Sequence, residues 1–510
     1  MVRLYCYYLL VSNNSSQKLG QLFFIGFQGY TLSKQIRNFL KQVQPGGIVF
    51  FECNIKDKKQ VKKLIAEINS LIKIKPFIAV DQEGGSVERL RKICTSVPSL
   101  WGLSKVGLKE LLTAQKIIAL ELKELGFNMN LSPVLDINSN PNNPIIGTRA
   151  LSDNSNTVSK YGLEIVKLFL KYKIIPVVKH FPGHGDLNID SHLSLPILNK
   201  TKTELNKFEL IPFKEAIKNN VPAIMVGHIQ LPYLEPDKVR PATLSKNILE
   251  SLLRKELKYK GLIITDELNM KGVTKNFTLQ NATYESLTAG ADMVLFNWEE
   301  NKTIKAFNYV LKKASRNKEL IKRIDESYKR VIALKNRNEL LGLRNKQNKF
   351  NSQSSILNPQ FFLSSTLADK VIHWIKRDLF FQPIHKSDLI EIIYPITPKL
   401  RSEDLLDILN GLGLKNHKLV TYELNPSTKD IRKIFIKSKK SNRKILITYD
   451  IAARKKQKQL ALELFKNSND LIVISVGLEH DIELIPQVKN LIAAYAPNYI
   501  SLLVAFKKLT

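Results

Sequence analysis

Cysteine is scarce in this sequence, which has only Cys6, Cys53 and Cys94 among its 510 residues. Their number is odd, and no two of them have the Cys-x-x-Cys spacing of a zinc site or a redox pair. The sequence therefore indicates no disulfide framework and is compatible with a reducing compartment.

Long apolar runs are missing as well, so no membrane-spanning helix is expected. The first residues, MVRLYCYYLLVSNNSS, contain a short apolar stretch but no A-x-A-like cleavage site. We expect residues 1–16 to form an N-terminal extension, and a weak export signal is the alternative. The predicted location is accordingly the cytoplasm, with export to the cell envelope as the alternative.

Acidic residues are few relative to basic ones. The chain has 46 Asp and Glu against 78 Lys and Arg, a formal net charge of +32. Such an excess favours anionic partners, but the lysines are spread along the whole chain and form no Arg-rich stripe with interleaved aromatics. We expect a solvated basic surface and no nucleic-acid partner. A non-catalytic protein that binds the cell wall or another polyanion is kept as an alternative.

Short apolar, β-rich runs recur through the first 300 or so residues, separated by longer amphipathic stretches. Eight such runs predict a (β/α)8 barrel, because the buried parallel strands of a barrel read as continuous apolar segments. The predicted strands are 22–27, 47–51, 77–80, 128–134, 175–178, 224–226, 262–265 and 293–296.

Polar side chains follow four of these runs directly. Asp81 follows FIAV, Lys179 and His180 follow IIPVV, His228 follows AIMVG, and Asp266 follows LIIT. In a barrel these positions share one rim around a central pocket, where barrel enzymes have their active sites. Isolated polar caps would not explain why four strands have the same arrangement.

A polar stretch rich in Asn, Gln and Ser divides the chain after the barrel. We predict a catalytic barrel domain at 17–342, a linker at 343–360 and a second domain at 361–510. Apolar runs in the second domain alternate with Lys- and Leu-rich helical patterns, which predicts a three-layer α/β sandwich. Its predicted strands are 389–394, 418–422, 445–449, 471–476 and 500–506.

The segment KHFPGHGDLNIDSH, residues 179–192, carries most of the chemistry. Its glycines and proline predict a loop that projects from the rim. Asp190 and His192 are two residues apart, so the carboxylate can accept a hydrogen bond from the imidazole, orient the ring and raise its pKa. This pair is a candidate general acid and base.

Metal binding is the competing hypothesis for the same loop, because His180, His184, Asp190 and His192 are all potential ligands. The glycines argue against it, since they prevent the helix that would place histidines four residues apart on one face. We therefore expect no metal and no other cofactor.

The loop resembles the signature segment of the bacterial β-N-acetylglucosaminidases of glycoside hydrolase family 3. Further motifs follow in the order found in that family: GQLF near Gly20, PGGI near Gly46, DQEGGSVER at 81–89, IGTR at 146–149, PATLS from Pro241 and ITDELNM at 264–270. The second domain is similar to the α/β sandwich of the two-domain branch, although that part of the match is looser.

The resemblance implies a retaining glycosidase that removes terminal N-acetylglucosamine (GlcNAc) from peptidoglycan fragments during cell-wall recycling or turnover. It implies Asp266 as the nucleophile, His192 as the acid/base and Asp190 as its partner. The implied substrate-binding residues are Asp81, Arg89, Arg149, Lys179 and His180, while His228 is expected to support the pocket floor.

Some alternatives stay open at this point. Asp266 can instead be a helix N-cap, and Arg89 or Arg149 can be a structural ion-pair partner of the carboxylates. A β-glucosidase or β-xylosidase of the same family is the rival activity, although the Asp-Ser-His sequence of the loop favours GlcNAc. Phosphate in place of water as the acceptor is also open, and the oligomeric state is not predicted.

Overall fold

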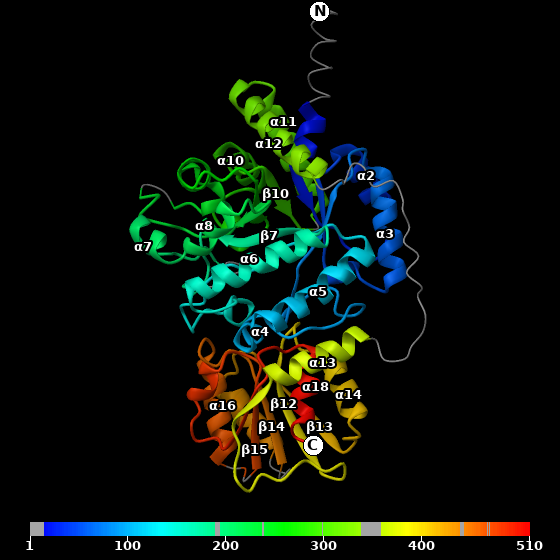
Figure 1. The fold of residues 1–510 in the computed structure, drawn as a ribbon, viewed down its shortest axis with the longest axis vertical. Coiled ribbons are helices and arrows are strands. Elements are labelled where there is room, and N and C mark those ends of the chain that lie inside the picture. Colours follow the sequence, from blue (N-terminus) through cyan, green and yellow to red (C-terminus); the bar gives the residue numbers. More distant parts are fainter. Residues whose placement is uncertain are drawn as a thin grey trace, which may run out of the picture.

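Eight parallel strands close into a barrel in the first part of the chain, and a separate six-stranded sheet follows (Figure 1). The computed structural model describes residues 15–188, 194–236, 239–297, 299–337, 359–438, 443–466, 468 and 470–510. The order of strands around the barrel is β1-β10-β9-β8-β7-β6-β3-β2. The predicted fold class, a barrel followed by a smaller α/β domain, is confirmed.

All eight runs predicted as barrel strands contain a strand. Their bounds are β1 (Phe23–Ile25), β2 (Gly47–Phe50), β3 (Phe77–Val80), β6 (Met129–Asn130), β7 (Ile175–Phe181), β8 (Ala223–Val226), β9 (Leu262–Glu267) and β10 (Met293–Phe296). A small antiparallel hairpin, β4 (Gln82–Gly84) and β5 (Val87–Glu88), follows β3.

Alternate residues of each barrel strand face the interior and the helical layer. Phe24 and Leu295 belong to the cluster that fills the barrel, whereas their neighbours Phe23 and Val294 pack into the core beneath the helices. Both faces of the strands are therefore buried, which explains why the sequence shows unbroken apolar runs.

Helices surround the barrel on its outer face (Figure 1). They are α2 (Lys34–Val43), α3 (Lys58–Leu71), α4 (Leu100–Val106), α5 (Leu108–Leu125), α6 (Ser155–Lys171), α7 (Lys202–Lys207), α8 (Ile211–Lys218), a π-helix at Asn247–Glu256, α9 (Lys271–Thr274), α10 (Leu279–Ala289), α11 (Glu300–Ala314) and α12 (Lys318–Arg337). Val331 and Leu334 of α12 join the cluster inside the barrel. Beside them Lys335 donates to Gln21 at 2.7 Å and lies over the ring of Phe77.

The second sheet has the order β11-β16-β15-β14-β12-β13, in which β11 is antiparallel to β16 and the other pairs are parallel. Helices cover it on both faces (Figure 1). Its elements are α13 (Pro359–Val371), β11 (His373–Lys376), β12 (Ile390–Ile396), α14 (Ser402–Gly411), β13 (His417–Glu423), α15 (Thr428–Lys437), β14 (Arg443–Thr448), α16 (Lys455–Lys466), β15 (Asp470–Ser475), α17 (His480–Glu483), β16 (Asn490–Ala493) and α18 (Tyr499–Lys507).

One predicted strand of this domain is wrong. The run 500–506 lies in helix α18, which begins after Asn498, whose side chain accepts a hydrogen bond from the Ser501 amide. Every residue of the run is buried, so its continuous hydrophobicity arises from a helix enclosed by the fold. The remaining four predicted strands correspond to β12, β13, β14 and β15.

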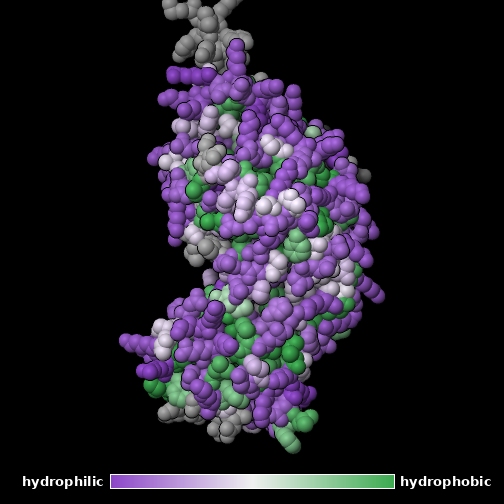
Figure 2. Space-filling view, turned by 90° about the vertical axis from the view of Figure 1, so that its left-hand side faces the viewer, coloured by the Kyte–Doolittle hydropathy of each residue, from purple (hydrophilic) through white to green (hydrophobic). Residues whose placement is uncertain are grey.

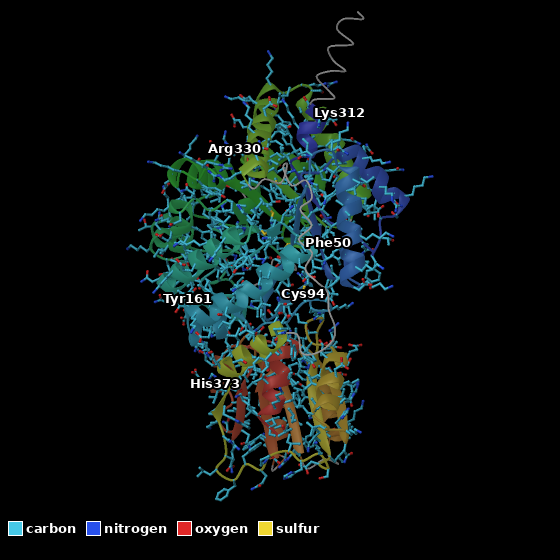
Figure 3. All side chains as sticks on the ribbon, turned by 45° about the vertical axis from the view of Figure 1, so that its right-hand side comes forward. Phe50, Cys94, Tyr161, Lys312, Arg330 and His373 are labelled. Carbon is cyan, nitrogen blue, oxygen red and sulfur yellow. The ribbon has the colours of Figure 1, made fainter. Side chains whose placement is uncertain are left out.

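The barrel and the second domain contact each other through α4, α5 and the loops of the barrel rim. Helix α13 packs against α4 and α5. The Trp101 indole donates to Glu479 at 3.1 Å, and the Asn498 amide donates to the Val97 carbonyl at 2.7 Å. Figure 3 locates Phe50 in the barrel and His373 in the sheet domain.

The predicted domain boundaries remain predictions. Helix α12 ends at Arg337 and α13 begins at Pro359, so nearly all of the predicted linker lies outside the described residues, as does most of the predicted extension at 1–16. Within the described residues, no helix has both the length and the apolar character needed to cross a membrane. Figure 2 shows hydrophilic residues over most of the face in view, on both bodies.

Candidate active site

A cavity of about 280 Å³ opens at the carboxyl ends of the barrel strands. It brings together all of the predicted catalytic and substrate-binding residues that the structure describes: Asp81, Arg89, Arg149, Lys179, His180 and Asp266. They come from β7, β9 and the loops that follow β3, β5 and β6. His184, Glu267, Met270 and Lys399 also line the cavity.

Lys179 is the centre of a buried ion cluster on one wall. Its ammonium lies 2.6 Å from Asp81 Oδ1 and 2.7 Å from Glu83 Oε1. Burial alone would lower the pKa of Lys179, but the charges of Asp81 and Glu83 raise it above its usual value. Lys179 is therefore a permanent cation that holds the Asp81 carboxylate in place.

Glu83 links Lys179 to Arg149. The Arg149 guanidinium donates two hydrogen bonds of 2.9 Å to the two oxygens of Glu83. Burial would raise the pKa of Glu83, but Arg149 and Lys179 hold it well below its usual range. The carboxylate thus fixes two cations at the pocket wall, and it binds Arg149 in a bidentate geometry that a lysine at position 149 could not reproduce.

A second buried carboxylate, Asp136, orients the two described histidines of the pocket. His180 Nδ1 lies 2.7 Å from Asp136 Oδ2, and the His184 backbone amide donates to Asp136 Oδ1 at 2.7 Å. Burial would raise the pKa of Asp136, but His180 and His184 lower it. Burial lowers the pKa of His184 to about 4, so this ring is neutral near pH 7.

Asp266 is the fifth residue of β9, and its Oδ1 accepts a hydrogen bond of 2.8 Å from the Glu267 amide. His228 supports this strand end from behind, because its Nε2 lies 2.8 Å from the Glu267 carbonyl oxygen and its Nδ1 lies 2.8 Å from Thr243 Oγ1. Nε2 can donate a hydrogen bond to the Glu267 carbonyl while Nδ1 accepts one from the Thr243 hydroxyl. His228 is fully buried and is not among the residues that line the cavity.

Arg89 stands nearer the solvent than the other basic residues of the barrel wall. Its guanidinium lies 4.0 Å from Asp81 Oδ2, and 40% of its side chain is exposed. The direct ion pair is therefore weak, which leaves Arg89 able to interact with a ligand.

Asp190 and His192, the predicted acid/base pair, lie outside the described residues, which stop at Asn188 and resume at Ser194. The start of their loop is fixed to the barrel. Asp186 pairs with Lys200 at 2.9 Å, and its carbonyl accepts a hydrogen bond from the Asn140 side chain. Gly185 packs so closely that a Cβ there would lie 1.7 Å from the Ile137 carbonyl oxygen.

Among the described residues, no three His, Cys, Asp or Glu side chains are grouped to hold a metal ion. Asp190 and His192, which are two of the four ligands in the metal hypothesis, lie outside the described residues. His180 Nδ1 is already bound to the Asp136 carboxylate.

The sequence prediction did not include Glu83, Asp136 or Lys399 in the site, and it named His184 only as a possible metal ligand. Glu83 lies inside the DQEGG motif, and Asp136 comes two residues after the run 128–134. Those two signals were available in the sequence. Lys399 belongs to the second domain, and no barrel pattern points to it.

The fold and the pocket define a class: a (β/α)8-barrel protein with a polar pocket at the carboxyl rim, where barrel enzymes carry out their chemistry. The chain belongs to glycosyl hydrolase family 3, since the sequence model for "Glycosyl hydrolase family 3 N terminal domain" matches residues 15–334.

Known proteins with similar sequences carry β-hexosaminidase names. Beta-hexosaminidase A of Pseudoalteromonas piscicida is 36% identical over 317 residues, which cover 55% of this chain and 53% of that protein. A Beta-hexosaminidase of Neisseria meningitidis serogroup C (strain 053442) is 31% identical over 274 residues, which cover 52% of this chain and 75% of that protein. The chain thus spans about half the length of the first of these relatives.

A solved structure is similar over nearly the whole chain. It is a glycoside hydrolase family 3 β-N-acetylglucosaminidase from Paenibacillus sp. str. FPU-7, with a TM-score of 0.85 and 31% identity. The match covers 97% of this chain and 96% of that one, so the second domain is included.

Proposed function

We propose that this protein is a retaining β-N-acetylhexosaminidase that removes GlcNAc from the non-reducing end of peptidoglycan fragments. The observation that carries the proposal is that Asp266 lines the same cavity as Asp81, Lys179, Arg149 and His180. A carboxylate at a strand end, surrounded by fixed hydrogen-bond donors and acceptors, suits nucleophilic attack on a bound sugar.

In this proposal Asp266 attacks the anomeric carbon while His192 donates a proton to the departing glycosidic oxygen. A covalent glycosyl-aspartate forms, and the aglycone leaves as an alcohol. His192, now neutral, then takes a proton from water as the water oxygen attacks the anomeric carbon, which releases GlcNAc and restores the Asp266 carboxylate. Asp190 orients the His192 ring and stabilises its charged form.

Substrate binding is assigned to the walls on either side of Asp266. Asp81, held in place by Lys179, can accept hydrogen bonds from two sugar hydroxyls. Arg149, Arg89 and His180 supply donors for the remaining hydroxyls and the N-acetyl carbonyl. Because Glu83 fixes Arg149 and Asp136 fixes His180, little of the binding free energy is spent on ordering these two donors.

The preference for GlcNAc is the finer part of the proposal. Retaining glycosidases usually employ two carboxylates about 5 to 5.5 Å apart, and a histidine acid departs from that plan. The Asp-Ser-His sequence at 190–192 and the names of the relatives support GlcNAc over glucose or xylose.

Chromogenic β-glycosides of GlcNAc, glucose and xylose, assayed side by side, test the proposal. We expect hydrolysis of the GlcNAc substrate, and a loss of kcat on the order of a thousandfold or more in Asp266→Asn. Asp407→Asn, at an exposed carboxylate of α14, is the matched control. Faster turnover of glucosides or xylosides would contradict the specificity, and an active Asp266→Asn enzyme would contradict the nucleophile. Added inorganic phosphate shows whether water or phosphate is the acceptor.

The cytoplasm is the proposed site of action. The scarcity of cysteine and the lack of a disulfide pattern in the sequence are compatible with a reducing compartment. Mass spectrometry of the N-terminus of the protein isolated from cells tests this, since removal of the first residues would indicate export.

A further inference from the structure

One residue of the second domain, Lys399, lines the barrel cavity. It belongs to the turn between β12 and α14, which is closed by a bridge between Thr397 and Leu400. The cavity that contains Asp266 therefore has one wall that the barrel does not supply.

The turn that carries Lys399 is fixed to the barrel rim. Arg91, which follows the β4–β5 hairpin, donates to the Pro398 carbonyl at 2.9 Å and to the Lys399 carbonyl at 3.5 Å. The same guanidinium pairs with Glu52, just after β2, at 2.6 Å. Contacts to its backbone thus hold the turn that carries Lys399 against the barrel rim.

The charge of Lys399 differs from that of the two buried cations of the barrel wall. Lys179 and Arg149 are neutralised by Asp81 and Glu83. The Lys399 ammonium instead donates to the neutral Tyr449 hydroxyl at 3.0 Å, and among the described residues no carboxylate lies within 4.0 Å of it. An ammonium has three donors, so this contact leaves capacity for an anionic ligand.

The Lys399 ammonium lies beside an aromatic ring. It is 5.6 Å from the centroid of the Tyr449 ring, and the Arg454 guanidinium is 5.2 Å from the same centroid. Arg454 pairs with Asp450 at 2.8 Å, so the acidic group beside this ring already has a cation as its partner. Partial burial of Lys399 strengthens its attraction for a ligand anion relative to a fully exposed lysine.

We propose that Lys399 forms a subsite of the second domain that binds a carboxylate on the leaving group of the substrate. This inference rests on the proposed function. When the buried barrel groups hold the GlcNAc ring, Lys399 and Arg89, which line the same cavity, remain to contact the leaving group. The substrate class is therefore a β-N-acetylglucosaminide whose aglycone carries a carboxylate.

Two aryl β-N-acetylglucosaminides test this subsite: one with a carboxylate on the aglycone, and its neutral methyl ester. The quantity measured is the ratio of their kcat/KM values, acid over ester, in the full-length protein. We expect Lys399→Met to lower that ratio about tenfold and Lys399→Arg to restore most of it, since a charge-assisted hydrogen bond is lost and regained. Raising the ionic strength should lower the wild-type ratio.

Lys429→Met, at an exposed position of α15, is the matched control, because it removes one positive charge of the same domain away from the cavity. We expect it to leave the ratio unchanged. An unchanged ratio in Lys399→Met, with GlcNAc hydrolysis intact, would overturn the subsite and leave the proposed function standing. Failure of the wild type to hydrolyse either aryl substrate would instead overturn the proposed function.

Discussion

Two buried cations share the Glu83 carboxylate behind the pocket wall. Glu83 is fully buried, and Arg149 and Lys179 both contact it. Charges removed from water need a partner, and a buried ion group that loses one member leaves the others uncompensated. Glu83 therefore contributes both to the fold and to the placement of the substrate-binding side chains.

Replacing Glu83 by Gln keeps the shape and removes the charge. We expect a loss of about 3 kcal/mol in the free energy of unfolding and a lower kcat/KM, because Arg149 and Lys179 would compete for Asp81. Glu67→Gln is the control, since its pair with Arg37 is partly exposed and should contribute less than about 1 kcal/mol. Denaturant titration measures the free energy of unfolding of both variants. Equal losses would show that the buried ion cluster contributes no more stability than the partly exposed pair.

The sequence predicted the pocket residues that belong to recognisable motifs, and missed those whose role depends on burial. Asp81 and Lys179 follow strand-like runs directly, so their place on the rim was predictable. Nothing in one sequence shows that Glu83 lies beneath Arg149 or that Asp136 faces two histidines, because these contacts join residues of different loops. Lys399 depends on how two domains meet, which local patterns do not encode.

Among the elements, most parallel strands were predicted, including β13 at an edge of the second sheet, whereas β11, the buried strand β16 and helix α18 were not. Strand β11 has mostly exposed residues and no alternation, so the sequence gives little signal for it. Helix α18 is buried along its whole length, and periodicity alone cannot distinguish such a run from a buried strand. Asn498, an N-cap residue just before that run, was the signal that favoured a helix.

The role of the loop that carries Asp190 and His192 can be tested by a substitution in its first turn. Gly185 has no room for a side chain, because a Cβ there would lie 1.7 Å from the Ile137 carbonyl oxygen. Gly185→Ala must displace this turn, and with it the segment that follows. We expect kcat on substrates with poor leaving groups to fall by about ten- to a hundredfold, and less on activated aryl substrates, since displaced general-acid groups act mainly on basic leaving oxygens.

Gly411→Ala is the matched control for this variant, because a Cβ at Gly411 meets no atom within 4 Å. It should leave both activities unchanged and keep the protein folded. Equal losses on good and poor leaving groups in Gly185→Ala would argue that the loop binds substrate and does not protonate the leaving group.

At the scale of the whole molecule, buried acidic groups lie where the two domains meet. Glu88 of the barrel accepts hydrogen bonds from Ser96 at 2.6 Å and from Asn498, which precedes α18, at 3.2 Å. Burial raises the pKa of Glu88 from its usual value to about 7. In the second domain, burial and the neighbouring Asp450 raise the pKa of Asp481 to about 7.

These shifts predict how the stability of the protein depends on pH. Because the folded pKa of Glu88 lies above its unfolded value of about 4.3, the folded state holds a proton that the unfolded state has lost. The stabilising effect of that proton is complete below the unfolded pKa and disappears as pH rises through about 7. Glu88 alone can lower the free energy of unfolding by up to about 3 kcal/mol across this window.

Thermal melts of the full-length protein between pH 5 and pH 8 test this prediction. We expect the wild-type Tm to fall over the range, and the fall to be smaller in Glu88→Gln, which stays neutral. Asp481 should leave a residual slope in that variant, and Asp481→Asn should reduce it further. Glu403→Gln, at an exposed position of α14, should keep the wild-type slope. An identical slope in the wild type and Glu88→Gln would show that Glu88 does not hold its proton at the domain boundary.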